Sequence, residues 1–429
     1  MPRRSAWTKA EPCDGLISES LKEIQSKLAN IRVAATRKKL SQAAPPDNLI
    51  PMSIRVVLSP CTDYGAVEPA LAAVLLPLEQ SLPLGRPGLR VLLKPNLITD
   101  GLPEEAKTTH PEVIRALIRY LRRRGAEVRV GDSPANVCDL EKVWQKTGIA
   151  AVCAEEQVEL VNFEKAGSEP FTIRGFSFNI ARPVLDAEMI VSVPKIKTHV
   201  LTLLTGGVKN MYGCVPGLQK TALHKFHPHP TDFHALLAAI YCCVPPTLTV
   251  ADAVVGMDGD GPTAGRPRSL GFLAASCDAA ALDATLARRL GLDLSAIGYL
   301  REIQEQNLGE IRAEQIEVIL TDPIPDLSPA FHAPQTISLG RLPRWITRPI
   351  APLIWNRPIF SDRCRLCGLC VRACPNGALS LTLRRVPVLN PGRCIACCCC
   401  HEVCPERAIV MQASPFLRFV MLLKKLTHA

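Results

Sequence analysis

The sequence contains no uninterrupted run of about 18 apolar residues, the minimum length of a helix that spans a membrane. Arg3 and Arg4 are not followed by an apolar stretch before Glu11 and Asp14, so they lack the central part of a twin-arginine export signal. We therefore expect a cytoplasmic protein that makes at most peripheral contact with a membrane.

Common ligand-binding fingerprints are also missing. The glycine-rich segment 205–220 has no Gly-Lys-Ser/Thr and no G-x-G-x-x-G, which excludes a Walker-type phosphate loop and a dinucleotide fingerprint. The turn Asp258-Gly-Asp260-Gly lacks the later glutamate of a calcium loop, so we interpret it as a plain turn. Four histidines without a nearby carboxylate or cysteine set are interpreted as surface residues: His224, His227, His229 and His234.

Eight of the 18 cysteines have no spacing pattern: Cys13, Cys61, Cys138, Cys153, Cys214, Cys242, Cys243 and Cys277. Scattered cysteines are more often small buried apolar residues than disulfide partners. A reducing compartment suits them, which agrees with a cytoplasmic location.

The other ten cysteines lie between Cys364 and Cys404, where the pattern C-x2-C-x2-C-x3-C-P occurs twice. In this pattern three thiolates hold one 4Fe-4S cluster, and the fourth reaches the cluster held by the other half. One predicted set of ligands is Cys364, Cys367, Cys370 and Cys404. The other is Cys394, Cys397, Cys400 and Cys374. Cys398 and Cys399 fall outside this register and are expected not to bind iron.

A pair of zinc knuckles is the alternative for this segment, because C-x2-C pairs also suit tetrahedral zinc. Zinc needs two pairs of ligands, whereas each half here has a third and a fourth cysteine followed by Pro375 or Pro405. We favour two 4Fe-4S clusters, and the segment resembles bacterial two-cluster ferredoxins.

The chain upstream of the clusters alternates short apolar runs with amphipathic segments. The runs expected to be strands are 54–58, 89–93, 128–130, 158–161, 189–193, 248–250, 270–274 and 316–320. The segments expected to be helices are 67–80, 111–124, 140–146, 232–244 and 279–290, and 171–180 is expected to be a hairpin around Gly175. Near-continuous apolar strands with helices between them are typical of a mostly parallel α/β sheet covered on both faces.

With 429 residues, the chain is too long for one ordinary core. We expect a helical extension at 1–50, an α/β domain at 51–325 and a Pro/Arg-rich linker at 326–360. A small α+β ferredoxin-like domain should follow at 361–412, and an amphipathic helix at 413–429.

Polar residues follow several predicted strands at the point where each strand ends. The carboxyl ends of strands in an open α/β sheet meet at one crevice, and ligands bind there. The residues that we expect to meet at a cationic, anion-binding crevice are Lys94, Asn96, Asp132, Ser133, Lys195, Lys197, Lys209 and Asn210. Capping of the following turn is the alternative role for Asp132.

These segments resemble a known family. They are Lys94-Pro95-Asn96, Thr109-His110-Pro111, Gly131-Asp132-Ser133-Pro134, Pro194-Lys195-Ile196-Lys197-Thr198-His199, Gly207-Val208-Lys209-Asn210 and Gly256-Met257-Asp258-Gly259-Asp260-Gly261-Pro262. Together they are similar to the family called domain of unknown function 362, over roughly residues 53–321. The resemblance implies the architecture, often with a ferredoxin-like tail as here, and it implies no substrate.

The net charge of +10 is unevenly distributed along the chain. Nine arginines between Arg341 and Arg385 face the single acidic residue Asp362. An acidic redox partner protein could dock on such a surface, and the alternative is a solvated face that compensates the charge of iron-bound thiolates. No nucleic-acid partner is expected.

Two functions agree with these patterns. The first is an iron-sulfur oxidoreductase that passes electrons through two 4Fe-4S clusters to an anionic substrate or cofactor in the cationic crevice. The second is a non-catalytic electron carrier or assembly factor whose α/β domain binds a partner protein. A closed pocket with inward-pointing lysines favours the first function, and a flat surface with solvated lysines favours the second.

Overall fold

The computed structural model describes residues 54–134, 137–328, 330–334, 355–382 and 386–419. The expected extension at 1–50, most of the expected linker and the end of the expected C-terminal helix lie outside these residues. Residues 415–419 are helical. Within the described residues, no helix is both long enough and apolar enough to cross a membrane.

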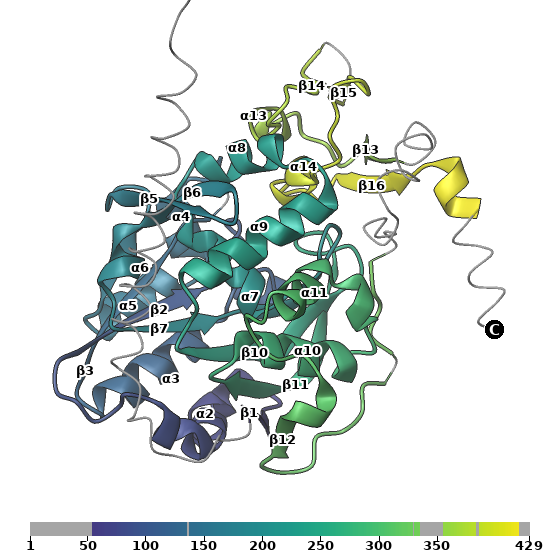
Figure 1. Ribbon diagram of the computed structural model, residues 1–429. Coiled ribbons are helices and arrows are strands. Elements are labelled where there is room, and N and C mark those ends of the chain that lie inside the picture. The colour runs from purple at the N-terminus through teal and green to yellow at the C-terminus, as the bar shows by residue number, and fades with distance from the viewer. Residues whose placement is uncertain (1–53, 135–136, 329, 335–354, 383–385, 420–429) are drawn as a thin grey trace, which may run out of the picture.

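A large, mostly parallel sheet forms the centre of the molecule (Figure 1). Its main path runs β12-β1-β11-β10-β7-β2-β3-β4, with β8 and β9 attached beside β10. In chain order, these strands are β1 (Ile54–Pro60), β2 (Leu89–Pro95), β3 (Ala126–Asp132), β4 (Glu159–Asn162), β7 (Met189–Val193), β8 (Lys195–His199), β9 (Leu203–Thr205), β10 (Leu248–Asp258), β11 (Arg266–Ser276) and β12 (Ile316–Leu320). The α/β prediction is confirmed.

Helices cover both faces of the sheet, and each face has its own core. One face packs on α2 (Val67–Leu75), α3 (Pro111–Arg122), α4 (Leu140–Lys146) and α5 (Ile149–Glu155). The other packs on α6 (Arg182–Asp186), α7 (Gly207–Asn210), α8 (Gln219–Phe226), α9 (Pro230–Cys243), α10 (Ala279–Arg289) and α11 (Gly298–Glu305). Successive side chains of a strand point to opposite faces, so Val56 and Leu58 enter one core and Val57 enters the other.

The expected hairpin is present, because β5 (Ser168–Ile173) and β6 (Phe176–Ala181) pair antiparallel. Gly175 has a φ of 83°, a left-handed conformation that glycine adopts without steric cost. Phe171 and Phe178, opposite each other in this hairpin, are buried in the second core.

The strand predicted at 248–250 is longer than expected. β10 continues to Asp258 and pairs antiparallel with β11, so the turn is confined to the residues between these two strands. Asp252 is tolerated inside the strand because its carboxylate lies 2.6 Å from Nζ of Lys195 on β8. Such a compensating charge on a neighbouring strand does not show in the local sequence.

The C-terminal unit consists of two similar halves. β13 (Asn356–Phe360) pairs with β16 (Ile409–Ala413), and β14 (Leu379–Ser380) pairs with β15 (Val388–Leu389). β13 lies within the range expected for the linker, so the C-terminal unit begins before residue 361. Gly368 precedes α13 (Leu369–Arg372) with a φ of 76°, and Cys398 precedes α14 (Cys399–Glu402) with a φ of 65°.

The C-terminal unit lies beside α8 and α9 (Figure 1), and four contacts hold it against the α/β unit. His401 Nε2 lies 3.0 Å from the carbonyl of Asp260, and Thr263 donates to the carbonyl of His401. Arg407 pairs with Glu105 at 3.1 Å. His199 at the end of β8 lies 3.1 Å from Glu402 on α14.

Candidate functional site

A cavity of about 100 Å³ lies between the α/β unit and the C-terminal unit. One ordered water molecule needs roughly 10–15 Å³ of such cavity volume, so this cavity has room for a small ligand of several atoms. The α/β unit contributes Lys94, Asn96, Leu97, Ile98, Asp132, Ser133, Pro134, Lys209, Asn210, Tyr212, Gly213, Lys220, Thr221 and His224 to its wall. The C-terminal unit contributes Ala373, Cys399, Glu402 and Val403.

Lys94 and Asp132 form the floor of this cavity at the ends of the adjacent strands β2 and β3. Their Nζ and Oδ1 atoms are 2.7 Å apart, and both side chains are buried. Lys94 also donates to the carbonyl of Pro95 and to Oδ1 of Asn210, while Asp132 accepts from the backbone of Leu97. Lys94 Nζ therefore has three close partners within the chain, two through hydrogen bonds and Asp132 through an ion pair.

Lys220, on α8, forms a second positive point in the wall. Its ammonium donates to the carbonyl and hydroxyl of Ser133 and to the carbonyl of Pro134. Burial lowers the pKa of Lys220 to about 8. Its three donors are occupied, so Lys220 offers charge to a ligand and no free hydrogen bond.

Lys209, unlike Lys94 and Lys220, has no partner for its ammonium group among the described residues. Within the described part of the chain, its ammonium has no hydrogen bond and no ion pair, although it lies in the cavity wall. Burial lowers its pKa, and the nearby carboxylate of Glu402 acts in the opposite direction. Oδ1 of Asn96, in the same wall, is a buried acceptor without a partner among the described residues.

Lys195 and Lys197 do not line this cavity. Lys195 is fully buried against Asp252, and it donates to the hydroxyl of Tyr64 and to the carbonyl of Val255. Lys197 is equally buried and donates to the carbonyl of Lys107. Burial lowers the pKa of both lysines. The structure thus brings six of the eight predicted crevice residues together and places these two behind them, on β8.

Several wall residues were not predicted from the sequence. His224 was expected at the surface, but it is buried, and it stacks on Phe233 with ring centroids 4.3 Å apart. The same surface prediction was wrong for His234, which is 1% exposed. Tyr212 donates its hydroxyl to the carbonyl of Lys220, and burial raises its pKa. Glu402 lies between two cluster motif cysteines, and no local pattern marks it as part of a distant crevice.

Glu402 and His199 form a polar pair at the boundary between the two units. The backbone of Leu201 donates to Nδ1 of His199, which leaves Nε2 to carry the proton that faces Glu402. Burial lowers the pKa of His199 to about 3, so the imidazole is neutral at physiological pH. The pair therefore adds one negative charge, that of Glu402, to the cavity wall.

The C-terminal unit contains two further cavities, and each has four predicted cluster ligands in its wall. One is lined by Cys364, Cys367, Cys370 and Cys404. The other is lined by Cys374, Cys394, Cys397 and Cys400, together with Cys398. These sets coincide with the crossed sets assigned from the spacing of the two motifs.

The two sets of thiols fit iron-sulfur clusters in donor type and arrangement. Cluster iron is held by four cysteine thiolates, and the walls are otherwise mostly apolar residues such as Phe360, Leu389 and Ile409. The thiolates of a 4Fe-4S cluster bind different iron atoms, so they lie further apart than the ligands of a single metal ion. Among the described residues, no three His, Cys, Asp or Glu side chains lie close enough together to hold a single metal ion.

Comparisons with known proteins agree with this architecture. The family described as "Domain of unknown function (DUF362)" matches residues 91–288, and the "4Fe-4S binding domain" matches residues 357–380. The chain is 31% identical over 266 residues to the thylakoid-associated protein sll1697 of Synechocystis sp. (strain ATCC 27184 / PCC 6803 / Kazusa), which covers 61% of this chain and 82% of that protein.

Among solved structures, the lactate racemase apoprotein from Thermoanaerobacterium thermosaccharolyticum is similar with a TM-score of 0.37 and 16% identity. The similarity covers 55% of this chain and 57% of that one.

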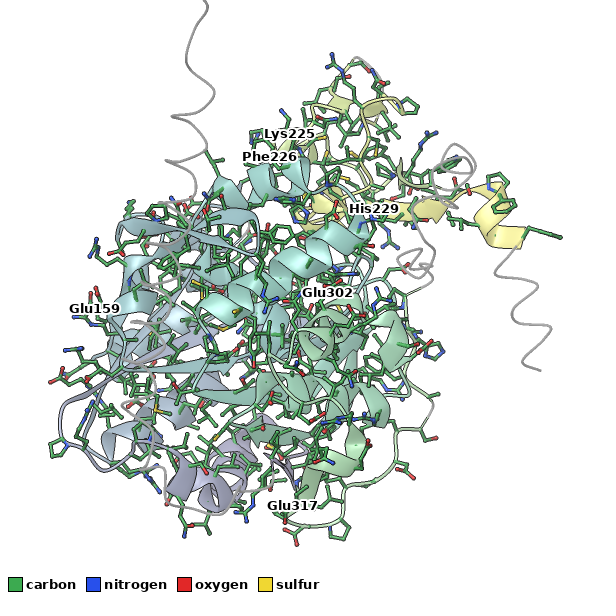
Figure 2. All side chains as sticks on the ribbon, viewed as in Figure 1. Glu159, Lys225, Phe226, His229, Glu302 and Glu317 are labelled. Carbon is green, nitrogen blue, oxygen red and sulfur yellow. The ribbon has the colours of Figure 1, made fainter. Side chains whose placement is uncertain are left out.

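The buried pair of Lys195 and Asp252 generates a stability prediction. Asp252→Asn should leave the Lys195 charge without compensation and lower the free energy of unfolding by about 3–5 kcal/mol. Glu317→Gln is the matched control, because its pair with Arg55 is solvent-exposed (Figure 2) and should contribute about 1 kcal/mol or less. Urea unfolding of both variants measures the difference, and equal losses would contradict a structural role for Lys195.

Proposed function

The chain belongs to the domain of unknown function 362 family and carries a 4Fe-4S binding domain, and we propose that it delivers electrons through two 4Fe-4S clusters to a small anion bound in the cavity between its two units. The anion is a substrate or cofactor that is reduced there. When bound, the clusters would supply single electrons.

Two clusters are proposed because eight thiols divide into two sets of four. Each set has a cavity of its own, and the two cavities share no wall residue. Cys398 occupies the left-handed position that Gly368 holds in the other half, so its backbone shapes the motif. We assign no iron to Cys398 or Cys399.

The observation that carries the anion proposal is the unpaired ammonium of Lys209 in the cavity wall. Lys94 and Lys220 each have three close partners within the chain, so Lys209 is the lysine of the described wall that is left to donate to a ligand. The unpartnered Oδ1 of Asn96 would accept a hydrogen bond from the same ligand. A small anion with at least one O–H or N–H group satisfies both atoms.

The position of the cavity supports electron delivery to that anion. Ala373 and Cys399 in its wall are sequence neighbours of Cys374 and Cys400, which both line the second four-thiol cavity. Nearby positive charge also makes an anion a better electron acceptor, because it stabilises the added electron. A ligand on Lys209 would therefore lie beside the Cys374, Cys394, Cys397 and Cys400 set.

The position of Lys209 favours an enzyme over a carrier or assembly factor. A lysine that recognises a partner protein lies on an open surface, whereas Lys209 is only partly exposed and lies in the wall of a cavity between the two units. A small ligand fits such a cavity better than a protein surface does. We therefore propose a reductase.

Iron content tests the cluster proposal. The anaerobically purified protein should contain about eight iron atoms, four for each cluster. Cys367→Ser removes one thiolate and should lose or convert one cluster, whereas Cys398→Ser should leave iron content and the visible spectrum unchanged. Iron and sulfide analysis measures both variants, and stoichiometric zinc in place of iron would refute the assignment.

Replacement of Lys209 tests the anion site. Lys209→Met removes a charge-assisted hydrogen bond of ~1.5–3 kcal/mol and should weaken anion binding by roughly 10- to 100-fold. Lys225→Met is the control, since Lys225 is exposed on α8 (Figure 2). Native mass spectrometry identifies a co-purifying anion, and calorimetric titration with small carboxylates and phosphate compares affinities. Equal affinities in the two variants would place the anion elsewhere.

The pH dependence of binding tests the contribution of Lys220. Its pKa of about 8 lies below the ordinary value, so the cavity should lose one positive charge as pH rises through about 8. Anion affinity should then fall by roughly tenfold, which corresponds to ~1.4 kcal/mol of lost attraction. Lys220→Met should bind more weakly with no inflection near pH 8. An unchanged inflection in that variant would assign the titration to another group.

A further inference from the structure

The cavity lined by Cys364, Cys367, Cys370 and Cys404 has an exposed thiol in its wall. Cys367 is exposed, whereas the other seven predicted cluster ligands are buried or partly buried. None of these four cysteines lines the anion cavity. The Cys364, Cys367, Cys370 and Cys404 set therefore faces outward. The Cys374, Cys394, Cys397 and Cys400 set lies on the side of the proposed ligand.

Three arginines of the described residues are exposed in this segment: Arg363, next to Cys364 and to the exposed Asp362, together with Arg365 and Arg372. Arg365 lines the cavity itself, and its side chain is 77% exposed. Arg372 lies beside Gly368, another wall residue, with Nη1 3.5 Å from the position that a Cβ of Gly368 would occupy. The ion pair of Arg365 with Glu406 is solvent-exposed, so it cancels little of this charge.

Two apolar side chains are exposed among the arginines. Leu366, in the cavity wall, is 38% exposed and Leu381 is 48% exposed. Leu381 also approaches Gly368, with Cδ1 3.4 Å from the same Cβ position. Arginine combined with exposed apolar groups is typical of a protein-binding surface, whereas a purely solvated face needs no leucine. We call Arg363, Arg365, Leu366, Arg372 and Leu381 the arginine face.

We propose that the arginine face docks a small acidic electron-carrier protein of the ferredoxin or flavodoxin class. This inference rests on the proposed function, for which it names the electron donor and the point of entry. One electron leaves the reduced carrier, which is oxidised, and is accepted at the site held by Cys364, Cys367, Cys370 and Cys404, which is reduced. No bond forms or breaks, and the electron moves on toward the Cys374 set and the anion.

The full-length protein with its clusters tests this proposal against an acidic flavodoxin. Binding of oxidised flavodoxin is measured by calorimetry, which involves no turnover. Oxidation of its hydroquinone is followed by stopped flow at several salt concentrations. Steering by opposite charges raises association rates by roughly 10- to 1,000-fold, and salt screens it. We expect tight binding at low salt and a rate that falls steeply as salt is added.

Arg363→Glu combined with Arg372→Glu should lower affinity and rate at least about tenfold and flatten the salt dependence. The control, Arg129→Glu with Lys142→Glu, reverses two exposed charges on the α/β unit and should change either quantity by less than about twofold. If the reversed variant loses iron, Arg363→Gln with Arg372→Gln should show a smaller decrease in the same direction.

A rate that is independent of salt, or equal in the two double variants, would overturn the proposal. Binding of the arginine face to phosphatidylserine vesicles without binding to flavodoxin would also overturn it. These measurements distinguish failure of the docking proposal from failure of the proposed function. If only the proposed function is wrong, no anion binds at Lys209 but flavodoxin still reduces the clusters. Conversely, docking can fail while the anion still binds.

Discussion

The buried ion pair between Lys94 and Asp132 is the interaction on which the rest of the site depends. It joins the carboxyl ends of β2 and β3 at 2.7 Å, and Asn210 from α7 completes the hydrogen bonds of Lys94. Because each charge compensates the other, the chain can bury a lysine at the floor of a cavity without an unpaired charge there. Gly213 must lack a side chain at this point, since a Cβ would lie 2.3 Å from Oδ1 of Asp132.

The cavity is complete only when both units are present. Ala373, Cys399, Glu402 and Val403 close it from the C-terminal side, and the His199–Glu402 contact lies at the junction. The contacts of His401 and Arg407 fix α14 over the strand ends. The same short helix therefore carries Cys400 on one side and closes the anion cavity with Cys399 and Glu402 on the other.

Much of the fold follows from the sequence because apolar runs and helix boundaries are local signals. The strand 189–193, the strand 316–320 and the helix 140–146 have the predicted bounds. From the rule that ligands bind at the carboxyl ends of strands, we expected Lys94, Asp132 and residues 209–210 to lie together, and they line one cavity. The rule failed to separate Lys195 and Lys197 from them, because β8 restarts after Pro194 and turns these lysines toward Asp252 and Lys107. Glu402 was unpredictable, since its role arises only when the C-terminal unit docks against residues far earlier in the chain, such as His199.

The central claim is that an anion on Lys209 accepts electrons from the neighbouring iron-sulfur sites. The most direct test is single-turnover reoxidation of the photoreduced protein by the anion identified in it, followed anaerobically by visible and electron paramagnetic resonance spectroscopy. The account predicts that the reduced iron-sulfur signal disappears in wild type as reduced product forms, and that it persists in the Lys209→Met variant at the same anion concentration. Binding of the anion to wild type with the reduced signal unchanged would contradict it.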